Sequence, residues 1–146
     1  MKKRKQFVPY ILLAVCMLCL SGCDNDVSDP SAAILGKWEL KERAYPGGAL
    51  QPFEPYEHIE FLSDGKVRTY DYESKEYQSG VASYWFEGIS DFLIIGRLDY
   101  SDGTVQGSVY SYEFVSKNVL KLEVKQLLGI HDAMMRPEIY IYKRKK

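Results

Sequence analysis

Polar and apolar residues alternate along much of the chain after residue 36, and the alternation comes in short runs. In the first run Trp38 and Leu40 share one face, whereas Lys37 and Glu39 share the other. A period of two is typical of a β-strand with one buried face. Such runs predict about eight strands, at residues 37–41, 58–61, 66–72, 80–86, 92–98, 109–115, 119–124 and 139–144. Because no strong long helix separates them, the pattern predicts an all-β fold, an antiparallel sandwich or barrel.

Turn signals separate the predicted strands. Ser-Asp-Gly occurs at residues 63–65 and again at 101–103, and Ser-Lys-Asn occupies residues 116–118. These sequences are typical of hairpin connections between antiparallel strands. Two longer stretches, residues 45–55 and 126–138, break the alternation. We expect them to form loops or lids at the rim of the fold.

A short helix is expected just before the first strand. Asp29 can cap it, and Pro30 suits the first helical position. Gly36 can adopt a positive φ and turn the chain out of the helix. We therefore expect Trp38 to enter the first strand facing inward.

The N-terminal 22 residues predict a signal peptide. Four basic residues at positions 2–5 precede an apolar run of 14 residues, 7–20. A bilayer-spanning helix needs about 20 apolar residues, so the run favours a secretory signal. A short transmembrane anchor is the alternative.

The residues at the end of this run, Leu20-Ser21-Gly22-Cys23, resemble the bacterial lipobox. The resemblance implies a lipoprotein whose Cys23 carries the lipid and becomes the first mature residue; an ordinary cleavage site is the alternative. Residues 23–33 are polar, acidic and small, and predict a flexible tether, which leaves one domain at residues 34–146. The acidic tether resembles export signals of surface lipoproteins in Bacteroidota, although an Asp here also resembles an inner-membrane retention signal. We expect a cell-envelope protein at the outer membrane, on its surface or its periplasmic face.

Charge and cysteine content exclude several classes of function. Of 19 basic residues, four belong to the signal, which leaves 15 against 20 acidic residues and a net charge of −5. An acidic domain disfavours non-specific binding of nucleic acid. All three cysteines lie at or before position 23, so the domain has no disulfide and no cysteine nucleophile or metal ligand.

The start and end of the predicted sheet carry a family resemblance. Gly36-Lys37-Trp38, at the start of the first strand, resembles the first signature of the lipocalins. That family places an arginine of its last strand over the tryptophan, and Arg144 is the best match, with Arg136 as the competitor. The chain looks most like the small Bacteroidota-type lipoproteins with a lipocalin-like domain. The resemblance implies an antiparallel up-and-down barrel of eight strands, closed at one end by Trp38 and Arg144.

The sequence offers little support for catalysis. His58 and Glu60 share one strand face and could form half of a metal site or a general-base pair, but we favour a solvent-facing pair. No Gly-x-Ser-x-Gly and no phosphate-binding glycine loop occurs. We therefore expect a non-enzymatic protein without a metal or cofactor.

Aromatic side chains supply most of the candidate ligand-binding positions. His131 is added to them, because it lies beside Asp132 in an irregular segment and could contact a bound anion. The ordinary polarity of a loop explains its presence there equally well. The candidates are Tyr84, Phe86, Tyr110, Tyr112 and His131.

Two classes of function remain open. The barrel could bind a small apolar ligand at its mouth. Alternatively it is filled by side chains and acts through its surface in a complex of the cell envelope. An eight-stranded barrel is wide enough for either arrangement. The large residues expected to point inward, Trp38, Phe61, Leu122 and Ile141, favour a filled or shallow interior.

Overall fold

The computed structural model describes residues 27–88, 91–98, 103–129 and 136–146. The predicted signal peptide and Cys23, the cysteine of the predicted lipobox, lie outside the described residues, and so does His131.

The described chain begins with the expected short helix, α2 (Pro30–Ala33). Asp29 is its N-cap, and a side-chain oxygen of Asp29 accepts a hydrogen bond of 2.9 Å from the Ser31 amide. Gly36 leaves the helix with a φ of 107°, a left-handed conformation that favours glycine. Both parts of this prediction are confirmed.

The rest of the described chain forms strands joined by turns and loops. Eight long strands build the sheet, and two short strands pair at its margins. The strands are β1 (Gly36–Ala44), β2 (Gln51–Pro52), β3 (Glu57–Phe61), β4 (Lys66–Asp71), β5 (Glu76–Tyr77), β6 (Ala82–Glu87), β7 (Phe92–Leu98), β8 (Val105–Ser116), β9 (Val119–Leu128) and β10 (Ile139–Arg144).

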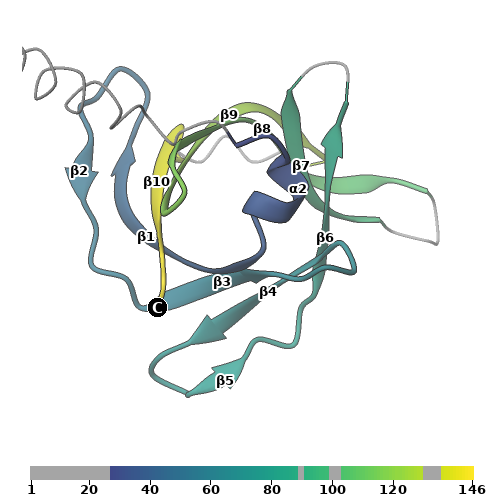
Figure 1. Cartoon of the computed structure of the whole chain (residues 1–146), viewed down its shortest axis with the longest axis horizontal. Coiled ribbons are helices and arrows are strands. Elements are labelled where there is room, and N and C mark those ends of the chain that lie inside the picture. The colour runs from purple at the N-terminus through teal and green to yellow at the C-terminus, as the bar shows by residue number, and fades with distance from the viewer. Residues whose placement is uncertain (1–26, 89–90, 99–102, 130–135) are drawn as a thin grey trace, which may run out of the picture.

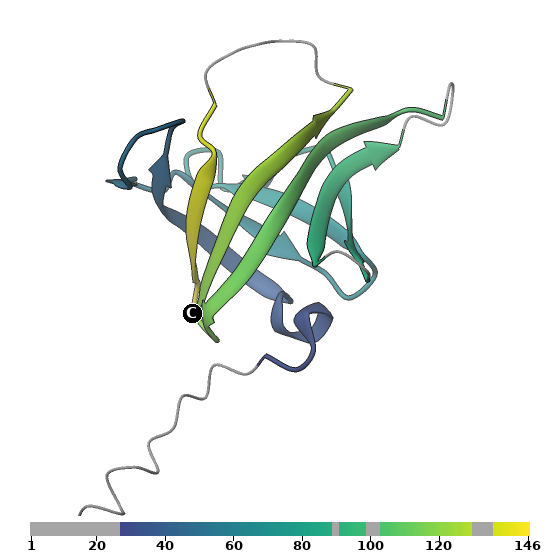
Figure 2. The ribbon, with the colours of Figure 1, turned by 90° about the horizontal axis from the view of Figure 1, so that it is seen from above.

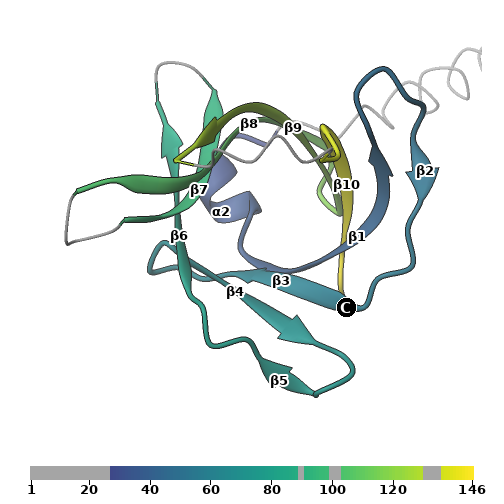
Figure 3. The ribbon, with the colours of Figure 1, turned by 180° about the vertical axis from the view of Figure 1, so that it is seen from behind.

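The sheet closes into a barrel. Its strand order is β10-β9-β8-β7-β6-β4-β3-β1, and a further antiparallel pairing joins β10 to β1 (Figure 1). Every pairing is antiparallel, and neighbours in the ring follow the order of the chain. The prediction of an up-and-down, eight-stranded antiparallel barrel is therefore confirmed. Short strands β2 and β5 pair with β1 and β4 and lie outside the ring (Figure 3).

The two ends of the barrel differ. In the side view of Figure 2, α2 lies across one end, which we call the closed end. The turns after β3 and β8 lie at this end, because Gly36 pairs with Phe61 and Trp38 pairs with Arg144. The opposite end, the mouth, is bordered by the end of β1 and the starts of β3 and β10. Pro46, Phe53 and Pro137, from the two predicted rim segments, line pockets there.

Aromatic and aliphatic side chains fill the closed half of the interior. Six large residues are almost completely buried: Trp38, Phe61, Ile34, Leu93, Leu120 and Leu122. A continuous run of ring contacts, 5.0–6.4 Å between centroids, passes through Phe61, Tyr84, Phe86, Tyr112, Phe114 and Trp38. Burial of these side chains supplies the main driving force for folding.

One inward assignment made from the sequence is wrong. Tyr140 and Tyr142 pack against the core, and Ile141 between them faces outward, where it pairs with Lys121 on β9. Successive side chains of a strand point to opposite faces. Assigning one residue to the wrong face therefore assigns every residue of that strand to the wrong face. The interior at the mouth is therefore lined by phenols where an aliphatic side chain was expected.

The structure also corrects the extent of several strands. Strands β7 and β10 match the predicted runs, but β8 begins four residues earlier than expected, at Val105, and β9 continues to Leu128. The segment 126–138 is thus partly strand. A register shift between Val109 and Tyr110 interrupts the pairing of these two strands, which explains why simple alternation ended too soon.

Candidate functional site

The mouth of the barrel contains two pockets that meet at the same two residues. The β1–β3 pocket, of about 250 Å³, extends from Trp38 and Ile59 in the interior to Phe53 and Tyr56 at the rim. The β8–β9 pocket, of about 390 Å³, lies between the ends of those strands and Arg136. Pro137 and Tyr140 line both pockets. Both volumes are close to the lower range of small-molecule sites, about 300–1,000 Å³.

Three tyrosines, Tyr110, Tyr140 and Tyr142, give the mouth both apolar and polar surface. The rings of Tyr110 and Tyr142 each lie 6.4 Å from the ring of Tyr140, measured between centroids. Burial raises the pKa of all three hydroxyls, and for Tyr140 burial together with the nearby Tyr110 raises it to about 12. The phenols are therefore uncharged near neutral pH. They offer apolar ring faces and neutral hydroxyl groups to a bound molecule.

Two arginines stand at the mouth. The guanidinium carbon of Arg43, from the end of β1, lies 4.6 Å from the ring centroid of Phe53 and 5.5 Å from that of Tyr45. Arg136 lines the β8–β9 pocket. Among the described residues, neither arginine has a carboxylate within ion-pair distance. The mouth therefore combines aromatic surface with positive charge.

Only part of the expected ligand-binding set lies at these pockets. Tyr110 lines the β8–β9 pocket. Tyr84, Phe86 and Tyr112 instead belong to the aromatic run of the core, and the Tyr84 hydroxyl donates a hydrogen bond of 2.8 Å to the Leu62 carbonyl at the closed end. Their rings pack against protein, away from both pockets.

Sequence reasoning missed three residues of the mouth: Arg43, Tyr140 and Tyr142. The two tyrosines were visible as alternate positions of the last strand, but they were assigned to the wrong face. Arg43 follows a register shift between Leu40 and Glu42, which alters the alternation along β1. No signal in the local pattern indicated where Arg43 points.

The structure brings Trp38 and Arg144 together at the closed end. The guanidinium carbon of Arg144 lies 4.3 Å from the indole centroid, and Trp38 is completely buried. Arg144 also donates hydrogen bonds to three carbonyls, those of Ala33 and Leu35 at 2.6 Å and that of Lys117 at 3.1 Å. The indole nitrogen donates to the Ile34 carbonyl at 2.6 Å. Arg144 thus joins the end of α2, the β8–β9 turn and the indole, whereas Arg136 lies at the mouth.

The prediction that His58 faces solvent is wrong. His58 points to the outside of the barrel, as its alternation indicated, but it is only 4% exposed. Tyr70, Tyr72 and Tyr77 cover it, with ring centroids 5.1, 5.7 and 6.4 Å from the imidazole. The hairpin of β4 and β5 supplies all three rings. Neither imidazole nitrogen has a hydrogen-bond partner among the described residues, and burial, aided by Lys145 and Lys37, lowers the pKa of His58.

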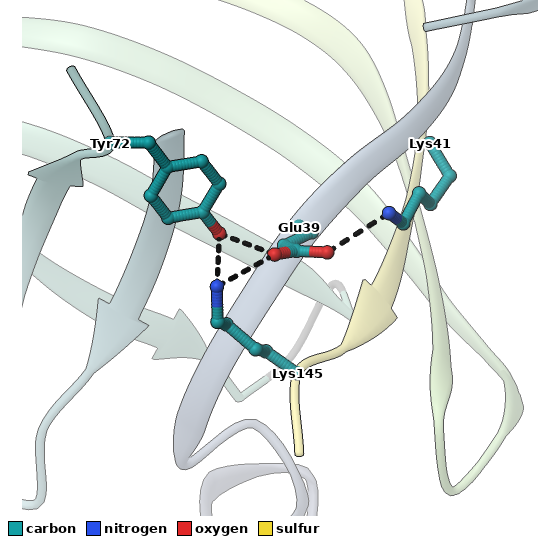
Figure 4. Close-up of polar contacts among 4 residues, drawn as sticks. All are labelled: Glu39, Lys41, Tyr72 and Lys145. Atoms are coloured by element: carbon teal, nitrogen blue, oxygen red, sulfur yellow. Dashed lines mark hydrogen bonds and ion pairs between the residues drawn. The ribbon is translucent and has the colours of Figure 1, made fainter. Parts of the chain in front are cut away.

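A network of charged and polar side chains borders this outer cluster (Figure 4). The Tyr72 hydroxyl donates to the Glu39 carboxylate, and the Lys145 ammonium donates to both, at 2.7 Å to Tyr72 and 2.9 Å to Glu39. Lys41 adds an ion pair of 2.9 Å to Glu39. Burial opposes ionisation of Glu39, but these hydrogen bonds outweigh it and lower its pKa to about 2.

This network holds its groups in their ordinary charge states. The pKa of Tyr72 is raised, mainly by burial and by Glu39, and the pKa of Lys145 is raised by its bonds to Tyr72 and Glu39. A general base needs a pKa close to the working pH. The arrangement therefore fits a structural connection between β1, β4 and the residue after β10.

No protein-family model and no curated protein matches the chain. Within the described residues, no group of three or more metal-binding side chains gathers at one place. In the same part of the chain, none of the helical structure has the length and apolar character needed to cross a bilayer.

Proposed function

We propose that this protein is a binding module: a lipocalin-like barrel that holds a small, largely apolar ligand at its mouth and catalyses no reaction. The observation that carries the proposal is the β1–β3 pocket, which runs from the rim to Trp38 and is lined by aromatic and aliphatic side chains together with Arg43 and Glu57. Concave, mostly apolar sites with a few polar groups are the usual form of a small-molecule site.

We further propose that the module is a lipoprotein of the outer membrane, anchored through a lipid on Cys23. The position of α2 supports an orientation for such a protein. The described chain starts beside α2, at the closed end (Figure 2). A short tether from Cys23 would therefore hold the closed end toward the bilayer and leave the mouth open to the surrounding solution, on the surface or the periplasmic side.

The first test is native mass spectrometry of residues 24–146, which contain every described element of the barrel, purified from a bacterial extract. A co-purified small molecule that is lost on mild denaturation is the expected result. Uptake of the dye N-phenyl-1-naphthylamine measures the same property in solution, because its fluorescence rises in an apolar site.

Two variants locate the site. Tyr140→Ala removes a ring shared by both pockets, and we expect it to weaken dye binding about tenfold, since the loss of one buried aromatic contact exceeds 1.4 kcal/mol. Tyr77→Ala removes a ring from the outer cluster and is the matched control. Equal dye binding by the two variants and the unaltered protein would place the dye outside the mouth.

A second function is favoured by the aromatic run that fills the closed half of the interior. On this alternative the barrel is an accessory protein that acts through its surface in an envelope complex. A ligand-free mass together with absent dye uptake would support it, and the search would move to protein partners.

A further inference from the structure

Among the described residues, the charged side chains that line the two pockets are more often positive than negative. The two pockets are lined by three cations, Arg43, Lys125 and Arg136, and by two acids, Glu57 and Glu138. Lys125 already forms an ion pair of 2.5 Å with Glu123, and Glu123 does not line either pocket. Arg43 and Arg136 have no such partner among the described residues.

The two acids do not neutralise these arginines. Glu57 accepts a hydrogen bond of 3.2 Å from the side-chain amide of Gln78, just after β5, and burial raises the pKa of Glu57. Glu138 is exposed at the rim, and among the described residues neither acid lies within ion-pair distance of Arg43 or Arg136. A guanidinium, in contrast, keeps its proton at every physiological pH.

The surroundings of Arg43 make an anionic partner favourable. Its guanidinium is half-buried and lies over the ring faces of Tyr45 and Phe53, and among the described residues it has no ion-pair partner. The planar fork of a guanidinium matches a carboxylate or a phosphate. A partly desolvated arginine that lacks an acceptor gains more from such a group than an arginine in open water does.

Both arginines act on the same place. The pockets that they line share Tyr140, and the charges of Arg43 and Arg136 both favour ionisation of the Tyr140 hydroxyl. A negative group next to that hydroxyl would therefore lie in the field of both arginines and could accept a hydrogen bond from the phenol. The apolar part of the same molecule would extend along Ile59 and Leu40 toward Trp38.

We propose that the mouth selects molecules with an apolar body and one anionic head group, with the head beside Tyr140, between Arg43 and Arg136, and the body directed toward Trp38. The inference rests on the proposed binding function and names the class of ligand. The head is a carboxylate or a phosphate, since both have the same chemistry toward a guanidinium.

The test compares probes that share one chain and differ in the head group. Isothermal titration calorimetry of residues 24–146 would use dodecanoate, dodecyl phosphate, 1-dodecanol and dodecyltrimethylammonium, all below their micelle concentrations. We expect either or both anions to bind at least about tenfold more tightly than the alcohol, and the cation to bind most weakly. A preference for dodecanoate over dodecyl phosphate, or the reverse, identifies the head group.

Variants of the two arginines test whether Arg43 and Arg136 cause the preference for an anionic head group. Arg136→Gln and Arg43→Gln should each raise the dissociation constant of the anionic probe about tenfold and leave that of 1-dodecanol unchanged. Lys66→Gln is the matched control, because it removes the same charge from an exposed turn at the closed end. Arg136 is exposed, so its replacement leaves the fold intact and keeps the test valid if Arg43→Gln proves unstable.

The outcomes separate this inference from the function on which it rests. Equal binding of the alcohol and both anions, or tighter binding of the cation, overturns the anionic head group while the apolar site stands. Arginine variants that weaken all probes equally also overturn it. Absence of binding by every probe overturns the binding function itself.

Discussion

His58 is a buried polar residue whose two ring nitrogens have no hydrogen-bond partner in the part of the chain that the structure describes. The groups that face it are the phenols of Tyr70, Tyr72 and Tyr77, with the charges of Lys37, Lys145, Glu39 and Glu60 nearby. An unsatisfied buried group reduces the free energy of unfolding, and a charged one reduces it further. The imidazole is therefore tolerated only while it stays neutral.

This position makes stability depend on pH. The pKa of His58 is lower in the folded barrel than its unfolded value of about 6.5, so the unfolded chain binds the proton more readily. The stability of the barrel is complete above about pH 6.5 and falls as the pH decreases below it. We expect His58→Leu to remove this slope and to leave the melting temperature at pH 7.5 equal or higher.

Melting curves at pH 7.5 and pH 5.5, followed by circular dichroism, check this expectation. His131→Gln, which replaces the other histidine of the chain, is the control. A His58→Leu variant with the same pH slope as the unaltered protein would show that another group titrates.

The hairpin of β4 and β5 has only a short connection to β6, the next strand of the ring. β4 pairs with β6 through Lys66↔Ser83 and Val67↔Ala82, and beyond these pairs the hairpin diverges from β6 (Figures 1 and 3). Besides the pairing of β4 with β3, side-chain contacts hold the hairpin over the outside of the barrel. They include the ring packing on His58 and the bond from Tyr72 to Glu39 on β1.

Glu39 should make this connection sensitive to acid. The pKa of Glu39 in the folded barrel, about 2, lies below its ordinary value of 4.5, so the contribution of Glu39 to stability is present above about pH 4.5 and is lost as the pH falls toward 2. Glu39→Gln should lower the free energy of unfolding at pH 7 by about 1–3 kcal/mol, because it removes hydrogen bonds to a charged group. The same variant should lose less stability than the unaltered protein between pH 4.5 and pH 2.

Urea unfolding at pH 7, 4.5 and 3 measures both effects. Glu113→Gln is the matched control. The Glu113 side chain is 63% exposed, and it forms a longer ion pair, 3.7 Å, with Lys121. Equal behaviour of the two variants at all three values would mean that the network around Glu39 adds no more than an ordinary surface pair.

The alternation of polar and apolar residues was sufficient to predict most of the strands, but it was insufficient to predict which residues form the site. It identified β7 and β10 completely, because turns or loops bound both ends and no bulge interrupts them. It misplaced Ile141 because the apolar residue of β10 faces out and the phenols face in. Nothing in the local sequence of His58 indicated the tyrosines that bury it, since they come from β4 and β5. Cover supplied by other strands is a tertiary property, which a period of two cannot reveal.

At the scale of the whole molecule, Trp38 connects the parts that close the barrel. It contacts Phe114 on β8 and Arg144 on β10, and it donates to Ile34 after α2. Trp38→Ala should lower the free energy of unfolding by about 3–5 kcal/mol, a large share of the roughly 5–15 kcal/mol typical of a domain. Chemical denaturation followed by near-ultraviolet circular dichroism measures the loss.

Trp85→Ala is the matched control for that measurement, because Trp85 lies on β6 with 40% of its surface exposed. We expect a loss of less than about 1 kcal/mol for an exposed position of this kind. Similar losses for the two tryptophans would contradict the central role of Trp38.

The pairing of β1 with β10 also determines when the protein can finish folding. Arg144 reaches back across 109 positions to the Leu35 carbonyl, and the seam of the barrel depends on the same long separation. During translation β1 leaves the ribosome long before β10 has been synthesised. The nascent chain therefore has an unpaired edge at β1 throughout translation. Closure is therefore a late event. A chain that is threaded across a membrane as it emerges would still lack its seam, and the finished ring would form only on the far side.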